Sequence, residues 1–156
     1  LPAPEVLRTA TPKVTGLDGR KMSKSYGNTI GLREDPDAVA AKLKTMQTDP
    51  ARVRRTDPGD PEKCPVWDLH KLYSSEDTLK WVDQGCRSAG IGCLECKKPL
   101  IERVVEEISG MRQRAQEYED NPDLVRGIIA EGCEKAREVA SQTLDDVKQA
   151  IGLSYR

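Results

Sequence analysis

The sequence contains no phenylalanine, and its aromatic residues together make up only 4% of the chain. With so few large aromatic side chains, a core has to come mainly from aliphatic residues on helix faces, which favours an all-α fold, a helical bundle. The sequence also has no apolar run long enough to cross a bilayer and no signal-like opening. We therefore expect a cytoplasmic protein that makes no membrane contact.

The sequence also lacks an excess of either charge, because its 25 basic and 26 acidic residues give a formal net charge of −1. A chain with this balance has no overall attraction to nucleic acid, so any RNA contact must come from local clusters of cations. Its 156 residues suffice for one modest core or two small helical units.

The most informative stretch is glycine-rich and covers residues 16–28, where three glycines frame two lysines and two serines. Ammonium and hydroxyl donors on a mobile backbone suit a polyphosphate, whose negative charge is spread over several oxygens. A solvated turn is the alternative interpretation, since Asp-Gly and Gly-Asn are common turn pairs. The candidate phosphate-binding residues are Lys21, Met22, Ser23, Lys24 and Ser25.

Residues 21–25 read KMSKS, the signature of class I aminoacyl-tRNA synthetases, and the lead-in 16–20 resembles their tryptophanyl branch. The resemblance implies that these five residues bind ATP, with Mg²⁺ in the complete enzyme. It also implies that Lys21 and Lys24 are catalytic and stabilise the charge of the departing pyrophosphate, with Lys24 contributing more.

Such a synthetase also needs a His-x-Gly-His segment, whereas His70 is the only histidine in this chain. The chain also begins at Leu1, and the signature lies near its start. We therefore expect a piece of a larger protein that lacks the nucleotide-binding fold. Residues 1–34 would be the end of the catalytic domain, and residues 35–156 an α-helical anticodon-binding domain.

Capping patterns predict where several helices begin. Asp35-Pro36, Ser74 or Ser75, and Asn121-Pro122 are typical helix starts. A long amphipathic helix is predicted from about Pro99, and its apolar side is expected to pack in a core. After a break at Gly132, a final apolar-striped helix is predicted, ending at Gly152.

Four of the five cysteines have the spacing C-x21-C-x6-C-x2-C, which predicts one shared four-sulfur site. Structural zinc, an iron–sulfur cluster and four reduced thiols all fit, and the unequal spacing is neutral to favourable for a cluster. The block resembles a subset of bacterial tryptophanyl-tRNA synthetases with a 4Fe–4S cluster, which implies that cofactor and leaves zinc as the alternative. The predicted ligands are Cys64, Cys86, Cys93 and Cys96.

The remaining candidates near this block have simpler interpretations. Cys133 is predicted to be a small buried residue, and His70 a packing or capping residue. Trp67 and Trp81 could stack on bases, but core packing is favoured for both.

Five cations flank the cysteine block, so a shared sulfur site would gather them into a positive face suited to a single-stranded RNA loop. Salt bridges to Asp57, Asp60 or Glu62 are the alternative for the arginines. In the family that the chain resembles, this region binds the anticodon of tRNA(Trp). The predicted RNA-binding residues are Arg52, Arg54, Arg55, Lys97 and Lys98.

Our interpretation is a portion of a tryptophan-activating synthetase that supplies the ATP loop and the anticodon-binding region. The resemblance implies that tryptophan and ATP bind through the missing domain, that the complete enzyme is a homodimer, and that this piece alone does not catalyse. A free-standing, metal-stabilised helical RNA-binding module without catalysis is the alternative. A tyrosyl relative shares the loop, but the cysteine block and the run after Pro50 argue against it.

Overall fold

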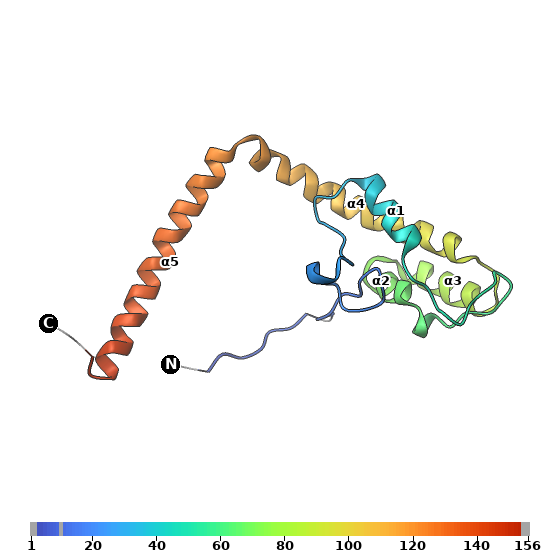
Figure 1. Cartoon of the computed structure of the whole chain (residues 1–156), viewed down its shortest axis with the longest axis horizontal. Helices are drawn as coiled ribbons and strands as arrows, with labels where there is room; N and C mark the ends of the chain where they lie inside the picture. The colour runs from blue at the N-terminus through green and yellow to red at the C-terminus, as the bar shows by residue number, and fades with distance from the viewer. Residues whose placement is uncertain (1–2, 10, 154–156) are drawn as a thin grey trace. The chain divides into compact units, whose positions relative to one another are not determined.

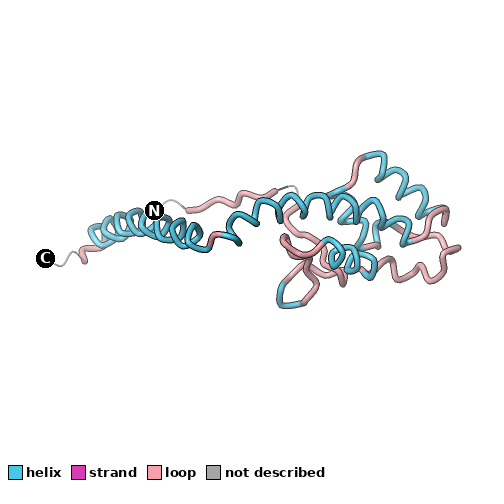
Figure 2. The backbone as a smooth tube through the Cα atoms, turned by 90° about the horizontal axis from the view of Figure 1, so that it is seen from above, coloured by secondary structure: helices cyan, strands magenta, loops and turns pink. Residues whose placement is uncertain are grey.

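The computed structural model describes residues 3–9 and 11–153. Their contacts divide the chain into two compact units, one ending at Arg112 and the other beginning at Gln113. Within the described residues the regular structure is helical, and one isolated bridge between Thr15 and Lys21 is the exception (Figures 1 and 2). The predicted all-α class is confirmed.

The first unit contains three complete helices and the start of a fourth. Two of them begin where the sequence predicts: the Asp35 side chain accepts the Asp37 N–H at 2.9 Å, and Ser75 Oγ accepts the Thr78 N–H at 3.3 Å. The elements are η1 (Lys24–Tyr26), α1 (Pro36–Thr45), η2 (Pro61–Lys63), α2 (Pro65–Tyr73), α3 (Glu76–Arg87) and the first part of α4 (Cys93–Asp120).

Helix α4 begins earlier than expected, at Cys93 instead of near Pro99, and the proline lies inside it. The N–H of Cys96 bonds to the carbonyl of Gly92 at 2.9 Å, which starts the helix. This correction matters because it places Cys93 and Cys96 together on the first turn of α4.

The core of this unit is aliphatic, as the composition predicts. Helices α1, α2 and α4 pack their buried faces together, and Tyr73 is only partly buried at the edge. Burial of such side chains is the main stabilising contribution to a helical unit of this size. The buried core residues are Val39, Leu43, Met46, Val66, Leu69, Leu100, Val104 and Ile108.

A buried lysine joins the start of α4 to the end of α1. Lys97 is only 3% exposed, and its Nζ donates to the carbonyls of Lys44 at 2.8 Å and Met46 at 2.6 Å. The last carbonyls of a helix have no partner within it, so the ammonium group supplies the missing donor. Burial lowers the pKa of Lys97.

The second unit contains the rest of α4 and helix α5 (Pro122–Ala150). Asn121 caps α5 as predicted, and Gly152, with φ of 74°, follows its end. Two expectations need correction. Gly132 does not break α5, and Cys133 is exposed instead of buried. No residue of α5 is buried within the described structure, so the predicted packing of its apolar stripe is not observed there.

None of the helices in residues 3–9 and 11–153 combines the length and the apolar character needed to cross a bilayer.

Candidate functional site: a cationic loop and a four-thiol centre

The glycine-rich stretch folds into a tight hairpin-like loop. The Met22 N–H donates to the Val14 carbonyl at 2.8 Å, and the Gly16 N–H donates to the Arg20 carbonyl at 2.7 Å. Gly19 at the turn has φ of +80°, a left-handed conformation that glycine adopts at little cost. The loop is attached to the helices at Asp68, whose carboxylate accepts the Thr15 hydroxyl at 2.8 Å.

Asn28 fixes the shape of this loop from within. Its side chain is buried, accepts the Ser23 N–H at 2.8 Å, and donates to Asp18 Oδ1 at 2.6 Å and to the Lys21 carbonyl at 3.2 Å. The amide of Asn28 is the main cause that lowers the pKa of Asp18 to about 2. Sequence reasoning treated Asn28 only as a turn residue, because nothing in the pair Gly27-Asn28 signals partners elsewhere in the loop.

The loop leaves its predicted ATP-binding side chains in different settings. Lys21, Lys24 and Ser25 are exposed, and neither lysine ammonium has a hydrogen-bond or ion-pair partner within the described structure. Ser23 Oγ lies 3.3 Å from Ser25 Oγ. Met22 is half-buried and lines an apolar hollow together with Leu69 of α2 and Val104 of α4. Both ammonium groups are therefore available to an anion.

We expect Asn28→Ala to loosen this loop, because it removes three hydrogen bonds and leaves buried groups unpaired. The loss should lower the free energy of unfolding by about 1–3 kcal/mol and speed amide exchange at Ser23. Thermal unfolding and hydrogen exchange read by mass spectrometry measure both. Gln113→Ala, which truncates an exposed amide, is the control. Unchanged exchange across residues 16–28 in Asn28→Ala would show that the amide does not hold the loop.

The four predicted cysteine ligands lie at helix ends. Cys64 occupies the N-cap position of α2, Cys86 is in the last turn of α3, and Cys93 and Cys96 are in the first turn of α4. Their charges interact: burial, and then the charges of Cys64, Cys86 and Cys93, raise the pKa of Cys96 to about 12. Burial is also the main cause that raises the pKa of Cys64 and of Cys86. The fold therefore places Cys64, Cys86 and Cys93 near enough to Cys96 for their charges to act on its thiol.

The thiols are not arranged around a single ion. Across residues 3–9 and 11–153, no three His, Cys, Asp or Glu side chains converge closely enough to hold one metal ion.

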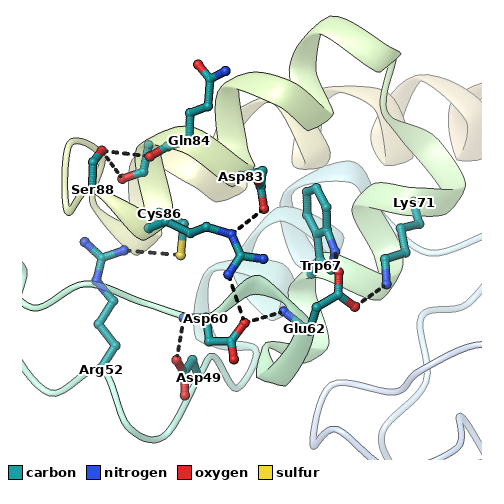
Figure 3. Close-up of polar contacts among 12 residues, drawn as sticks. Asp49, Arg52, Asp60, Glu62, Trp67, Lys71, Asp83, Gln84, Cys86 and Ser88 are labelled. Atoms are coloured by element: carbon teal, nitrogen blue, oxygen red, sulfur yellow. Dashed lines mark hydrogen bonds and ion pairs between the residues drawn. The ribbon is translucent and has the colours of Figure 1, made fainter.

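A buried arginine supplies positive charge to this centre (Figure 3). Arg52 is 9% exposed, and its Nη1 donates to Cys86 Sγ at 3.7 Å. Its Nη2 donates to the carbonyls of Arg55 at 2.9 Å and Ile91 at 2.7 Å, while Nε is buried without a partner. Thiolates buried in a protein need compensating charge, so this guanidinium fits a negatively charged four-sulfur group.

Two further residues shape the thiol centre. His70 is buried, with Nε2 at 3.5 Å from Cys96 Sγ and Nδ1 at 2.7 Å from Ser74 Oγ, and burial lowers its pKa to about 4. It therefore packs against the centre as a neutral ring. A Cβ on Gly59 would lie 2.6 Å from Cys86 Sγ, so only glycine leaves room for the sulfur there. Neither Gly59 nor the internal role of Arg52 was identified from the sequence.

The predicted RNA-facing set has to be corrected. Arg52 and Lys97 are buried, because both donate to backbone carbonyls inside the unit, so neither contributes to a positive surface. Arg54, Arg55 and Lys98 are exposed. Arg55 pairs with Glu95 at 3.1 Å, and not with the acidic residues considered from the sequence.

The two tryptophans also differ from each other. Trp67 is 8% exposed, as expected for core packing, and its Nε1–H donates to Glu62 at 2.9 Å. Trp81 is 44% exposed, so the prediction of core packing was wrong for it.

Comparison with known proteins shows the family to which the chain belongs. Residues 2–109 match the family model described as tRNA synthetases class I (W and Y). The tryptophan–tRNA ligase of Ralstonia nicotianae is 59% identical over 155 residues, which are 99% of this chain and 39% of that protein. The corresponding ligase of Thermotoga maritima is 44% identical, over 99% of this chain and 47% of its own length.

A solved structure agrees with the sequence matches. The tryptophanyl-tRNA synthetase of Campylobacter jejuni, crystallised with ADP and tryptophan, superimposes with a TM-score of 0.72 and 30% identity. The match covers 90% of this chain and 44% of that protein. The chain thus spans less than half the length of these relatives. It belongs to the class I tRNA synthetases (W and Y), and within them it is homologous to tryptophan–tRNA ligases.

Proposed function

We propose that this chain is the portion of a tryptophan–tRNA ligase that supplies the ATP-binding signature loop and a helical tRNA-binding region. The observation that carries the proposal is the pair of unpaired ammonium groups, Lys21 and Lys24, on a loop fixed by Asn28. The Campylobacter jejuni relative was crystallised with ADP and tryptophan, which supports a nucleotide and an amino acid as ligands of the complete enzyme.

In this proposal the loop acts on the phosphates of ATP, with Mg²⁺, when tryptophan is adenylated. Negative charge builds up on the pyrophosphate as it leaves, and a preorganised ammonium group stabilises that charge. Lys24 lies at the start of η1, where the backbone is held by the bond between the Gly27 N–H and the Lys24 carbonyl. Its side chain is thus free to reach a phosphate while its backbone stays fixed. Lys21, Ser23 and Ser25 add donors for the remaining oxygens, and Met22 anchors the loop.

We further propose that Cys64, Cys86, Cys93 and Cys96 hold a 4Fe–4S cluster. Two features fit a four-sulfur cluster: the four thiols whose charges interact, and the buried guanidinium beside Cys86. Bound there, the cluster would cross-link the ends of α2, α3 and α4 and so stabilise the first unit. Four thiolates are needed to hold it, so its binding would release the thiol protons.

The exposed cations Arg54, Arg55 and Lys98 are proposed to contact the phosphates of the tRNA(Trp) anticodon loop. They lie on the connector before Cys64 and on α4 just after Cys96, two segments that the Arg55–Glu95 ion pair joins. A cytoplasmic location and a homodimeric complete enzyme belong to the same proposal.

A chimera tests the function. This chain replaces the matching segment of the Ralstonia nicotianae ligase, and tryptophan-dependent exchange of pyrophosphate into ATP is measured. We expect exchange with tryptophan and aminoacylation of tRNA(Trp). The Ralstonia protein without the segment is the negative control, and tyrosine is the control substrate. A folded chimera that is inactive with tryptophan, or active only with tyrosine, would refute the proposal.

A further inference from the structure

The exposed tryptophan has no role in the sites described so far. The chain has only two tryptophans, and Trp67 is used in the core, where its indole N–H is bonded. Trp81, on α3, has 44% of its surface exposed, and its indole N–H has no hydrogen-bond partner among the described residues. A large aromatic side chain left in solvent in a protein this poor in aromatics suggests a binding surface.

Trp81 lies in a surface hollow of about 600 Å³ between α3 and the start of α4. The hollow contains one flat aromatic face, one exposed ammonium group and two carboxylates. Its lining residues are Asp77, Thr78, Trp81, Glu95, Lys98 and Pro99.

A second hollow, of about 380 Å³, adjoins the first and shares Glu95 with it. Its lining includes Arg54, Arg55 and the exposed apolar side chains of Val53 and Leu94. Glu95 is already neutralised by Arg55 at 3.1 Å and accepts the Gly92 N–H at 2.5 Å. With that ion pair set aside, two exposed cations, Arg54 and Lys98, remain against Asp77, the one carboxylate left unpaired in the two hollows. The combined surface is complementary to a polyanion.

We propose that Trp81 is a stacking platform for one unpaired base of a single-stranded RNA loop. The base lies on the indole face, Lys98 pairs with the adjoining phosphate, and the carboxylates of the hollow accept hydrogen bonds from the amino edge of the base. Arg54 and Arg55 hold the next phosphates along the second hollow. The inference rests on the proposed tRNA-binding function and assigns the residue that contacts a base.

The test measures binding of the fluorescently labelled anticodon stem–loop of tRNA(Trp) to the full chain by anisotropy. Trp81→Ala should weaken binding by about 5- to 150-fold, the range for loss of one base–aromatic stack, and Trp81→Phe should restore most of it. Tyr118→Ala is the matched control, because Tyr118 is 47% exposed and lies in the second unit. Lys98→Gln should reduce the salt dependence of binding by about one phosphate contact.

The intrinsic fluorescence supplies a second readout. RNA binding should quench the emission of Trp81 and protect it from acrylamide, while a fully base-paired hairpin without a loop should do neither. Equal affinity of wild type, Trp81→Ala and Trp81→Phe would overturn the inference. So would equal affinity for the loop and the loopless hairpin, no RNA binding by the wild-type chain, or protection of Trp81 by self-association without RNA. Because pyrophosphate exchange needs no tRNA, the chimera reports on the proposed function independently of these results.

Discussion

Replacing Lys24 with alanine should lower tryptophan-dependent pyrophosphate exchange by the chimera about 10²- to 10³-fold. This is the usual cost of removing one preorganised donor from a site where charge develops in the transition state. The affinity for tRNA should stay the same, because the side chain of Lys24 has no contact with the four-thiol centre or with the exposed cations beside it.

The control for this experiment is Lys44→Ala, which removes an exposed lysine side chain from α1. That variant should keep wild-type exchange, and Lys24→Arg should recover part of the activity because it restores a cation. If Lys24→Ala weakened tRNA binding and left exchange intact, Lys24 would belong to RNA recognition and not to the ATP loop.

The second large effect that we expect is weaker binding of the cluster when Gly59 is replaced by alanine. Because a Cβ there would lie 2.6 Å from Cys86 Sγ and 3.1 Å from Arg52 Cδ, Gly59→Ala should displace the thiol from the centre. Cluster affinity should fall about 10- to 100-fold, as is typical when the support of a ligand is lost. Iron, acid-labile sulfide and visible absorption after anaerobic reconstitution measure the change.

The chain offers matched controls for this prediction. Gly132→Ala adds a methyl group in α5 where nothing lies within 4 Å, and it should keep the full iron content. Cys96→Ser should lose the cluster, while Cys133→Ser, at an exposed cysteine, should retain it. Colourless protein with one equivalent of zinc and no sulfide would refute the cluster. Wild-type iron content in Gly59→Ala would refute the role of Gly59.

Local sequence signals predicted the helix starts well. Asp35, Ser75 and Asn121 each cap a helix through a bond to an N–H a few residues along the chain. The partners of such caps lie within the next turn, so the sequence contains all the information that the cap needs. The assignment of residues 21–25 as an ATP loop remains a prediction, because it rests on their match to a family signature.

The sequence did not predict hydrogen bonds between residues that lie far apart in the chain. The two residues removed from the predicted RNA surface, Arg52 and Lys97, are buried because their donors reach carbonyls 39 and 51 positions away. A charged side chain is normally expected at the protein surface. Only the fold shows that a buried backbone carbonyl lies where it needs the donor of that side chain.

Helix α5 shows two other limits of predicting structure from sequence patterns. A glycine inside a helix costs only about 1 kcal/mol, so Gly132 weakens α5 without breaking it. An apolar stripe indicates that a helix has a face to bury, but not which segment covers it. The sequence therefore predicted that this stripe packs in a core, but the described residues show no such packing.

The buried lysine at the start of α4 has a consequence for chemical modification. Lys97 and Lys98 are neighbours in sequence, yet the fold buries the amine of Lys97 and leaves the amine of Lys98 exposed to solvent. Of these two amines, acylating enzymes and amine-directed reagents thus meet only that of Lys98 on the native protein. A change that neutralised Lys97 would instead leave two carbonyls at the end of α1 without their donor.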